Sequence, residues 1–183
     1  SRDAFETSFF TLSQKENHSI AKAALGKLLF YDPVLSSNGK RSCPPCHKPE
    51  FGFTDGLARS TSMNPGESLR RNAPTLLNAA FDRKLFLDGR TLTLERQATE
   101  VINNPDEMHG NFSSAAERLQ RSDEYTRLFA LAFSDEDGQE INGPNIVSAL
   151  AEFERTLISL NSRFDQAIRG RKDALSKAEI HGF

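Results

Sequence analysis

Two cysteines and a histidine form a compact cluster of reactive side chains. Cys43 and Cys46 lie three residues apart, and His47 follows directly. On a helical turn this spacing puts both thiols on the same side, where they can reach the two vinyl groups on one edge of a porphyrin. The next imidazole then lies under the iron. C-x-x-C-H is the attachment sequence of c-type haem. The motif therefore predicts one covalently bound haem c, with His47 as the proximal ligand.

Three other uses of closely spaced cysteines remain open at this point. A thioredoxin-like C-x-x-C site would require a βαβ context. A zinc site would require further ligands, and the chain has no third cysteine. A disulfide across three residues would close a loop too short to stabilise the fold much. Haem attachment is favoured because the motif is complete and uses both cysteines.

The composition agrees with a large apolar cofactor. Hydrophobic residues make up only 37% of the 183 residues, yet the chain has 14 phenylalanines beside 2 tyrosines and no tryptophan. Phenylalanine has no polar group, so these rings favour burial, and a porphyrin gives them an apolar surface. The net charge of −2 gives no bulk attraction to nucleic acid or anionic membranes. The longest apolar run, Leu128 to Phe133, is too short to span a bilayer.

Helical periodicity dominates most of the chain, so the fold class is predicted to be mainly α. Residues that can cap a helix precede apolar repeats at Ser19, Thr93, Ser114 and Ser122. The first of these helices is expected to bury Ile20, Ala24, Leu25, Leu28 and Leu29. The longest helix is expected to begin after Gly143-Pro144 and to bury Ile146, Leu150, Phe153, Leu157 and Leu160.

Residues 33–74 break this helical pattern. The segment contains six of the eight prolines and four of the eleven glycines, which is typical of loops. A loop of this length inside a compact domain is usually functional or disordered, and this one contains Cys43 and Cys46. We therefore expect a cytochrome c-like haem domain with long ordered loops and little or no β structure.

Further segments around the motif resemble a known family. Leu-Gly-Lys-Leu-Leu-Phe-Tyr-Asp-Pro precedes it and Gly-Phe-Thr-Asp-Gly follows it. The series resembles the N-terminal half of the bacterial di-haem cytochrome c peroxidases, a family that includes the di-haem enzymes that modify tryptophan in methylamine dehydrogenase. The likeness extends from about Leu25 to Phe183 and implies that this chain carries the peroxidatic haem. The segments that carry it are residues 25–33, 52–56, 71–81, 88–90, 104–108 and 151–157.

The resemblance implies roles for three side chains near that haem. Gln97 and Glu107, ten residues apart as in the family, match its distal glutamine and glutamate, and Phe86 matches a ring of the same pocket. A sheltered carboxylate can move the proton that O–O cleavage requires, while an amide orients the peroxide. On spacing alone, Glu107 fits the first turn of a helix, favoured by the helix dipole, and Gln97 fits a solvated helix position.

Two further groups of ligands are expected around the haem. Arg71 and Arg90 are predicted partners of the haem propionates, since guanidinium groups bind carboxylates, and a plain surface role fits each of them equally well. Asn72 matches a ligand of the calcium ion that family members hold between their two domains. The resemblance therefore implies haem c and a calcium ion as cofactors.

Three substitutions depart from the family pattern. Leu87 replaces the tryptophan that lies between the two haems, so an oxidisable ring is absent from the expected electron route. Asn64 replaces a histidine that in many members is a detachable ligand of the resting iron, and Met63 beside it is a candidate substitute ligand. Val101 replaces a distal-pocket proline. With no histidine to displace, the ferric iron is expected to rest five-coordinate.

The sequence predicts three parts. Residues 1–18 are expected to be an N-terminal extension, and residues 19–170 the c-type haem domain. Residues 171–183 are expected to begin a linker or helix toward a second haem domain, because Ser176-x-x-Glu179 predicts a helix start and resembles a segment that family members carry shortly before their second haem site. A second C-x-x-C-H does not occur in this sequence. The expected whole protein thus has two haems, of which this chain binds one.

The leading functional hypothesis is reduction of hydrogen peroxide to water. By resemblance, the electrons would come from a small c-type cytochrome or a copper protein, and the protein would form a homodimer. Covalent haem attachment implies a periplasmic or otherwise exported location. The alternatives are a haem c electron carrier or sensor without peroxide turnover, and a branch of the family that oxidises another substrate.

Overall fold

The computed structural model describes residues 20–134 and 139–182, and this part of the chain contains seven α-helices and no β-strand. Three isolated bridges are the only β pairing in the described ranges. The predicted mainly α fold is confirmed. The predicted extension, residues 1–18, and the predicted cap Ser19 lie outside the described residues. The helices are α2 (Ile20–Tyr31), α3 (Leu94–Asn103), α4 (Phe112–Gln120), α5 (Asp123–Ala132), α6 (Gly143–Arg155), α7 (Arg163–Ile168) and α8 (Lys177–Gly182), with 3₁₀ turns η1 (Pro33–Leu35), η2 (Pro49–Phe51) and η3 (Ala79–Phe81).

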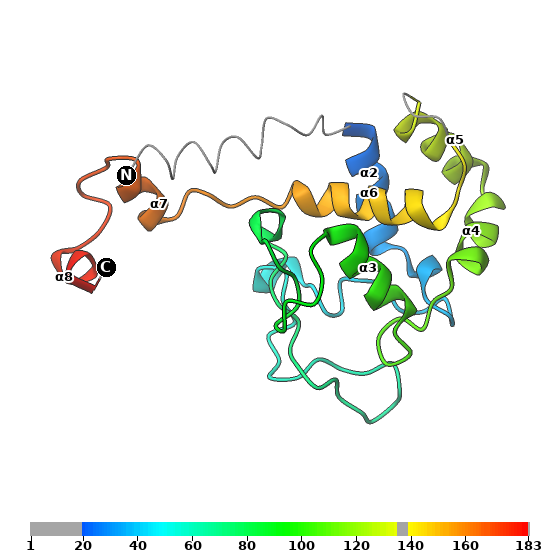
Figure 1. The fold of residues 1–183 in the computed structure, drawn as a ribbon, viewed down its shortest axis with the longest axis horizontal. Helices are drawn as coiled ribbons and strands as arrows, with labels where there is room; N and C mark the ends of the chain where they lie inside the picture. Colours follow the sequence, from blue (N-terminus) through cyan, green and yellow to red (C-terminus); the bar gives the residue numbers. More distant parts are fainter. Residues whose placement is uncertain (1–19, 135–138, 183) are drawn as a thin grey trace.

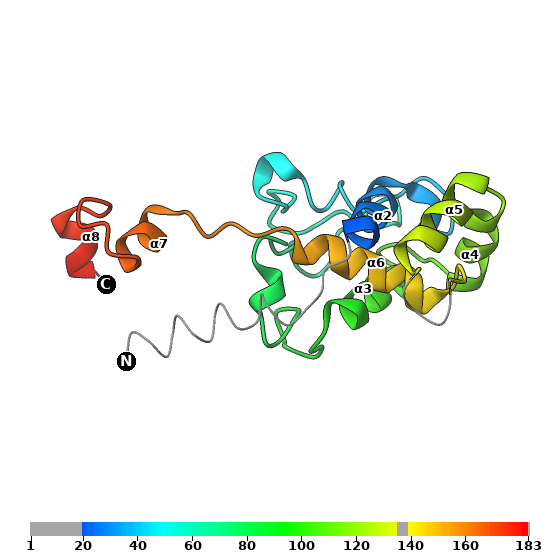
Figure 2. The same cartoon turned by 90° about the horizontal axis from the view of Figure 1, so that it is seen from above.

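Helix α6 is the centre of the helical body. It packs along α2 and also contacts α3 (Figures 1 and 2). Leu25 and Leu29 of α2 share one buried cluster with Ile146 and Leu150 of α6. Gly26 lies where the two helices meet, and a Cβ atom there would lie 1.8 Å from the Ala149 carbonyl oxygen. Glycine is therefore required for the two backbones to approach this closely.

The substitution Gly26→Ala is expected to destabilise the fold by about 3 kcal/mol, because the new methyl group would meet backbone and not a movable side chain. Chemical denaturation followed by circular dichroism measures this loss. Gly182→Ala is the control, since nothing lies within 4 Å of a Cβ built at Gly182. An unchanged unfolding midpoint for G26A would contradict the close packing of α2 on α6.

The helix starts follow the predicted caps in part. Thr93 and Ser122 each accept a hydrogen bond from the backbone N–H three residues further on, so both predicted caps are confirmed. The cap predicted at Ser114 is wrong. Asn111 caps α4 instead, and its side-chain oxygen accepts a hydrogen bond from the Ser114 N–H at 3.1 Å.

The predicted buried face of α2 is also partly wrong. Leu25 and Leu29 are buried as expected, but Ile20 is 88% exposed and Leu28 is 47% exposed. Ala24 is exposed as well. The buried face of α2 differs from the predicted one because α2 contacts α6 at Gly26. A search for repeating apolar residues does not identify a glycine as a contact position.

Helix α6 ends at Arg155, so Leu157 and Leu160 lie beyond it. Asn78 holds the following backbone: its N–H donates to the Leu157 carbonyl oxygen at 2.8 Å, and its side chain exchanges hydrogen bonds with the backbone of Ser159. Helices α7 and α8 follow this segment and lie apart from the helical body in both views (Figures 1 and 2). None of the described helices is long and apolar enough to cross a membrane.

Residues 33–74 form the long loops that their composition predicts. Two helices fix the start of this segment. The Tyr125 hydroxyl of α5 donates to the Asp32 carboxylate at 2.7 Å. Arg118 of α4 donates to the carbonyl oxygens of Val34 and Ser36. The chain is thus held in place just before it reaches the two cysteines.

Candidate haem site

The C-x-x-C-H segment forms a single helical turn. The N–H groups of Cys46 and His47 both donate to the Cys43 carbonyl oxygen at 3.1 Å. The Cys43 N–H in turn donates to the Phe30 carbonyl oxygen at the end of α2, also at 3.1 Å. No disulfide joins the two thiols. The turn is therefore the geometry that the spacing predicts, and α2 anchors it.

The His47 imidazole is held in one tautomer. Its Nδ1 atom lies 3.0 Å from the Phe53 carbonyl oxygen, which can only accept, so Nδ1 carries the hydrogen. Burial lowers the pKa of His47, and the nearby Asp55 charge opposes this only in part. The ring is thus neutral at pH 7 with its lone pair on Nε2. This is the state that a metal-binding histidine needs, with its other nitrogen hydrogen-bonded to fix the ring.

The Cys43 thiol does not resemble a redox or zinc thiolate. Burial, together with the charges of Glu154 and Cys46, raises the pKa of the Cys43 thiol. Reactive C-x-x-C sites and zinc sites both require thiolates, which a raised pKa disfavours. Within the described ranges, no group of three or more His, Cys, Asp or Glu side chains is placed to hold a metal ion.

An aromatic wall lies beside the proximal histidine. The Phe30 ring lies 6.5 Å from the His47 ring, 6.4 Å from Phe53 and 5.2 Å from Phe153 of α6, measured between centroids. Phe53 has a φ of +60°, which directs its carbonyl oxygen to His47. The apolar rings and the fixed imidazole fit a haem attached at Cys43 and Cys46.

Glu107 lies in the turn after α3, where its N–H donates to the Asn104 carbonyl oxygen at 3.1 Å. Its Oε2 atom is buried and has no hydrogen-bond partner. Burial raises the pKa of the Glu107 carboxyl, while the charges of Arg90 and Arg41 lower it. Glu107 therefore has a buried, unpaired oxygen and a proton affinity above that of an ordinary glutamate.

The turn that carries Glu107 has a fixed path. The Gly110 N–H donates to the Ile102 carbonyl oxygen at 2.6 Å, and His109 has a φ of +47°. A Cβ atom at Gly110 would lie 2.2 Å from the Leu35 carbonyl oxygen. The turn thus packs directly on the loop that leads to Cys43.

The structure places the other two predicted distal residues at different points. Gln97 is half-buried on α3. Phe86 is half-buried with a φ of +61°, and the Arg90 guanidinium lies 3.4 Å from its ring centroid. The charge of Arg90 also lowers the pKa of Glu107. The distal roles of Gln97 and Phe86 stay predictions.

The two predicted propionate ligands converge on one carboxylate. Arg71 and Arg90 lie 3.2 Å and 3.0 Å from the Asp88 carboxylate, and Arg90 also pairs with Glu100 at 2.8 Å. Both arginine side chains are half exposed. Asn72, the predicted calcium ligand, is exposed. Binding of propionates or calcium by these residues stays a prediction.

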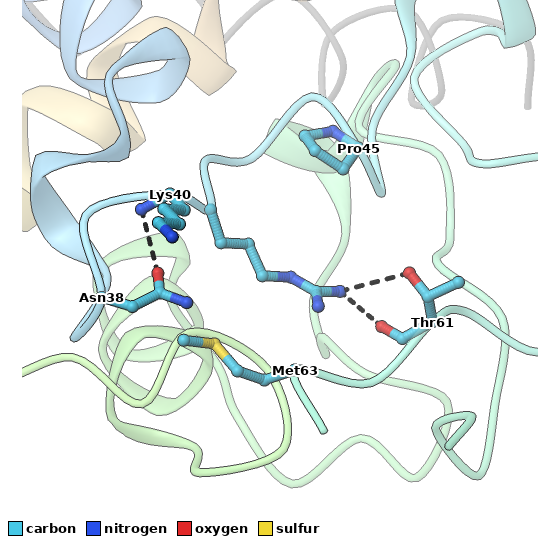
Figure 3. A pocket seen from close by; sticks show the side chains of 6 residues that line it. Asn38, Lys40, Pro45, Thr61 and Met63 are labelled. Atoms are coloured by element: carbon cyan, nitrogen blue, oxygen red, sulfur yellow. Dashed lines mark hydrogen bonds between the residues drawn. The ribbon is translucent and has the colours of Figure 1, made fainter. Parts of the chain in front are cut away.

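Arg41 is a residue of the site that sequence reasoning missed. Its guanidinium lies 3.6 Å from the Cys46 sulfur and also donates to the Thr61 carbonyl oxygen. Arg41 and Thr61 line a surface hollow of about 250 Å³ together with Met63 and Pro45 (Figure 3). The position of Arg41 two residues before Cys43 could have identified it as a residue of the site. Its contact with Thr61, twenty residues later, could not be predicted from the sequence.

The loop that carries Met63 is tied to the Glu107 turn. The Met63 N–H donates to the Asp106 carbonyl oxygen at 2.7 Å. The Asn64 side chain donates to Asp106 Oδ1 at 3.3 Å and to Glu67 at 3.1 Å. Asn64 is exposed and Met63 half-buried. The structure thus places the substituted loop beside the candidate distal carboxyl.

Comparison with known proteins identifies the family. The profile of the di-haem cytochrome c peroxidases matches residues 20–173. The chain belongs to the di-haem cytochrome c peroxidase family. The methylamine utilization protein MauG of Methylophilus methylotrophus is 39% identical over 165 residues, covering 90% of this chain and 48% of that protein. The cytochrome c551 peroxidase of Nitrosomonas europaea is 36% identical over 161 residues, 88% of this chain and 47% of that protein.

Solved structures of di-haem peroxidases show the same fold. A MauG-like protein associated with microbial copper homeostasis superimposes with a TM-score of 0.80 and 34% identity, covering 90% of this chain and 48% of that one. The di-haem peroxidase BthA of Burkholderia thailandensis has a TM-score of 0.72 and 26% identity over 90% of this chain and 45% of its own. This member of the di-haem cytochrome c peroxidase family thus spans about half the length of the relatives it matches.

Proposed function

We propose that this chain binds haem c through Cys43, Cys46 and His47 and is the peroxidatic part of an enzyme that reduces hydrogen peroxide to water. The fixed tautomer of His47 supports the haem site. Peroxide turnover rests on one observation: Glu107 is half-buried and its Oε2 atom is buried without a hydrogen-bond partner, on a turn packed against the haem-attachment loop. A side chain in that state can exchange a proton with a bound reactant.

The side chains divide the proposed reaction between them. When bound, haem supplies the iron at which the O–O bond of peroxide is broken and through which two electrons pass. Glu107 accepts the proton of the near oxygen and returns it to the departing oxygen. Gln97 orients the peroxide and Phe86 excludes water from the site. Two protons from solvent and two electrons from a donor complete the conversion of one peroxide to two waters.

The wider assignments belong to the same proposal. Residues 19–170 form the haem domain, with residues 1–18 as an extension and residues 171–183 leading to a second haem domain. The donor is a small c-type cytochrome or copper protein, and Asn72 contributes to a calcium site between the domains. The protein is a homodimer exported to the periplasm or an equivalent compartment. Family membership supports the haem domain and the donor class, and the proposed covalent haem attachment supports export.

A haem c electron carrier or sensor is the second candidate function. Two observations favour it. Leu87, at the position where the resemblance implies a tryptophan, is 83% exposed. Asn64, at the position of the detachable histidine, has no imidazole and is hydrogen-bonded to Asp106. Mixing haem-loaded protein with peroxide and a reduced small cytochrome c separates the two. Peroxide-dependent oxidation of the cytochrome supports the enzyme. Electron exchange with the cytochrome that does not depend on peroxide supports the carrier.

The resting ferric haem is expected to be high-spin and to bind peroxide without prior reduction. The reason is that the loop carries Asn64 in place of a histidine and so offers no imidazole to the iron. The Asn64 side chain is also held by hydrogen bonds to Asp106 and Glu67. Absorption and electron paramagnetic resonance spectra of the oxidised protein measure the spin state. Met63→Ala is the companion variant and is expected to leave the spectrum unchanged. A low-spin spectrum that M63A converts to high-spin would instead identify Met63 as the distal ligand.

A further inference from the structure

Glu154 is a buried carboxyl for which the proposed peroxide chemistry has no use. It lies in the last turn of α6, and only 7% of its surface is exposed. Its Oε2 atom is buried without a hydrogen-bond partner. An unpaired carboxylate oxygen in the interior carries a large desolvation cost, which the side chain avoids by holding a proton.

The surroundings of Glu154 connect it to the haem-attachment turn. Cys43 packs against the buried apolar cluster to which Phe153, the residue before Glu154 on α6, belongs. Burial raises the pKa of the Cys43 thiol, and the charge of Glu154 raises it further. Phe153, the preceding residue on α6, packs on Phe30, and Phe30 packs on His47. The end of α6 therefore lies against the cysteine that would hold the edge of the porphyrin.

The other charges that meet Glu154 are few. From α3, Glu95 opposes its ionisation, while Arg155 beside it on α6 favours ionisation. Arg155 is itself paired, at 2.6 Å with Glu95 and at 3.6 Å with Glu152. From α2, the uncharged residues Phe30 and Gly26 lie against Phe153 at this end of α6. Burial and Glu95 together raise the pKa of Glu154 to about 8. The carboxyl is thus largely neutral at pH 7 and ionises just above it.

We propose that Glu154 takes up a proton when the haem attached at Cys43 is reduced. The inference rests on the proposed haem attachment. Reduction adds one electron from the donor to the ferric haem and so removes one unit of positive charge from the iron. A nearby carboxylate in a poorly screened interior then binds a proton from solvent more tightly. The balanced step is one electron and one proton taken up together in the pH range where Glu154 titrates.

The direction of the pH dependence follows from this linkage. Below the range in which Glu154 titrates, the carboxyl is protonated in both redox states and the reduction potential is flat. As pH rises through about 8, the oxidised protein loses the proton first, so reduction must recover it and the potential falls. A fully coupled proton lowers the potential by about 59 mV per pH unit, the equivalent of a tenfold change in a one-electron equilibrium.

The test is a redox titration of the haem-loaded protein at a series of pH values, followed by haem absorption. The wild type is expected to show the falling potential above about pH 7. Glu154→Gln, which keeps the shape and removes the titration, is expected to show a flat potential over the same range. Glu95→Gln is expected to move the break to lower pH, because it removes a repelling charge and frees Arg155. Glu117→Gln, an exposed position of α4, is the unchanged control.

Each outcome decides one question. A potential of E154Q that falls with pH as in the wild type overturns the inference, since the haem propionates or another group then titrate. If E154Q does not fold, E95Q decides alone, and a break that stays in place overturns the inference. A protein without a haem absorption band overturns the proposed haem attachment itself, so the two failures are distinguishable.

Discussion

Replacing His47 with alanine is expected to lower peroxide turnover by more than about a hundredfold. Mutation of a residue that only hydrogen-bonds to a metal ligand lowers activity by up to about a hundredfold. His47 is the expected ligand itself, so its loss should cost more. Its Nδ1–H is bound to the Phe53 carbonyl oxygen, so the lone pair available to an iron ion is on Nε2. Steady-state consumption of peroxide, measured per mole of bound haem, gives the size of the loss.

The control for this prediction is His181→Ala, because His181 is exposed on α8 and away from the helical body. It should leave the haem spectrum and turnover unchanged. His47→Ala should also change the haem absorption spectrum, which reports loss of the axial ligand independently of turnover. A wild-type spectrum in H47A would mean that another residue binds the iron.

Replacing Glu107 with glutamine is expected to lower peroxide turnover by about a hundredfold to ten-thousandfold, the usual contribution of a general acid–base group. The amide keeps the size of the side chain and cannot accept a proton. Burial raises the pKa of Glu107, against the charges of Arg90 and Arg41. Because only the ionised carboxylate takes the proton, the wild-type rate should rise with pH through this raised pKa. The rate of E107Q should lack that rise.

The haem absorption spectrum separates a chemical effect of E107Q from a structural one. It should match the wild type, because Glu107 is not an expected iron ligand. Glu117→Gln on the exposed face of α4 is the matched control and should retain full turnover. If E107Q reduces peroxide as fast as the wild type, Glu107 has no part in the chemistry and the electron-carrier function gains support.

Local signals in the sequence predicted the local structure well. The C-x-x-C-H turn, the caps at Thr93 and Ser122 and the loops of residues 33–74 all depend on neighbours within a few residues. Ser114 was a wrong cap because Asn111 can also cap, and a start at Asn111 buries Ala115, Ala116 and Leu119 of α4. Both Asn111 and Ser114 are residues that can cap a helix, so local preference does not distinguish them, and tertiary packing favours the start after Asn111.

Contacts across the chain were not predictable in the same way. The buried face of α2 is set by the approach of Gly26 to α6, and the end of α6 by hydrogen bonds from Asn78. Around the candidate haem, Arg41 is hydrogen-bonded to Thr61 and the charge of Glu154 raises the pKa of Cys43, in both cases across large gaps in sequence. No spacing rule connects such pairs, so their chemistry emerges only once the chain is folded.

The most direct test of the central claim is the reaction of oxidised, haem-loaded protein with one equivalent of hydrogen peroxide, followed by haem absorption in a stopped-flow instrument. A rapid spectral change is expected in the wild type, slowed about a hundredfold or more in E107Q. A haem spectrum that does not respond to peroxide would contradict peroxidatic function and leave a haem c electron-transfer protein.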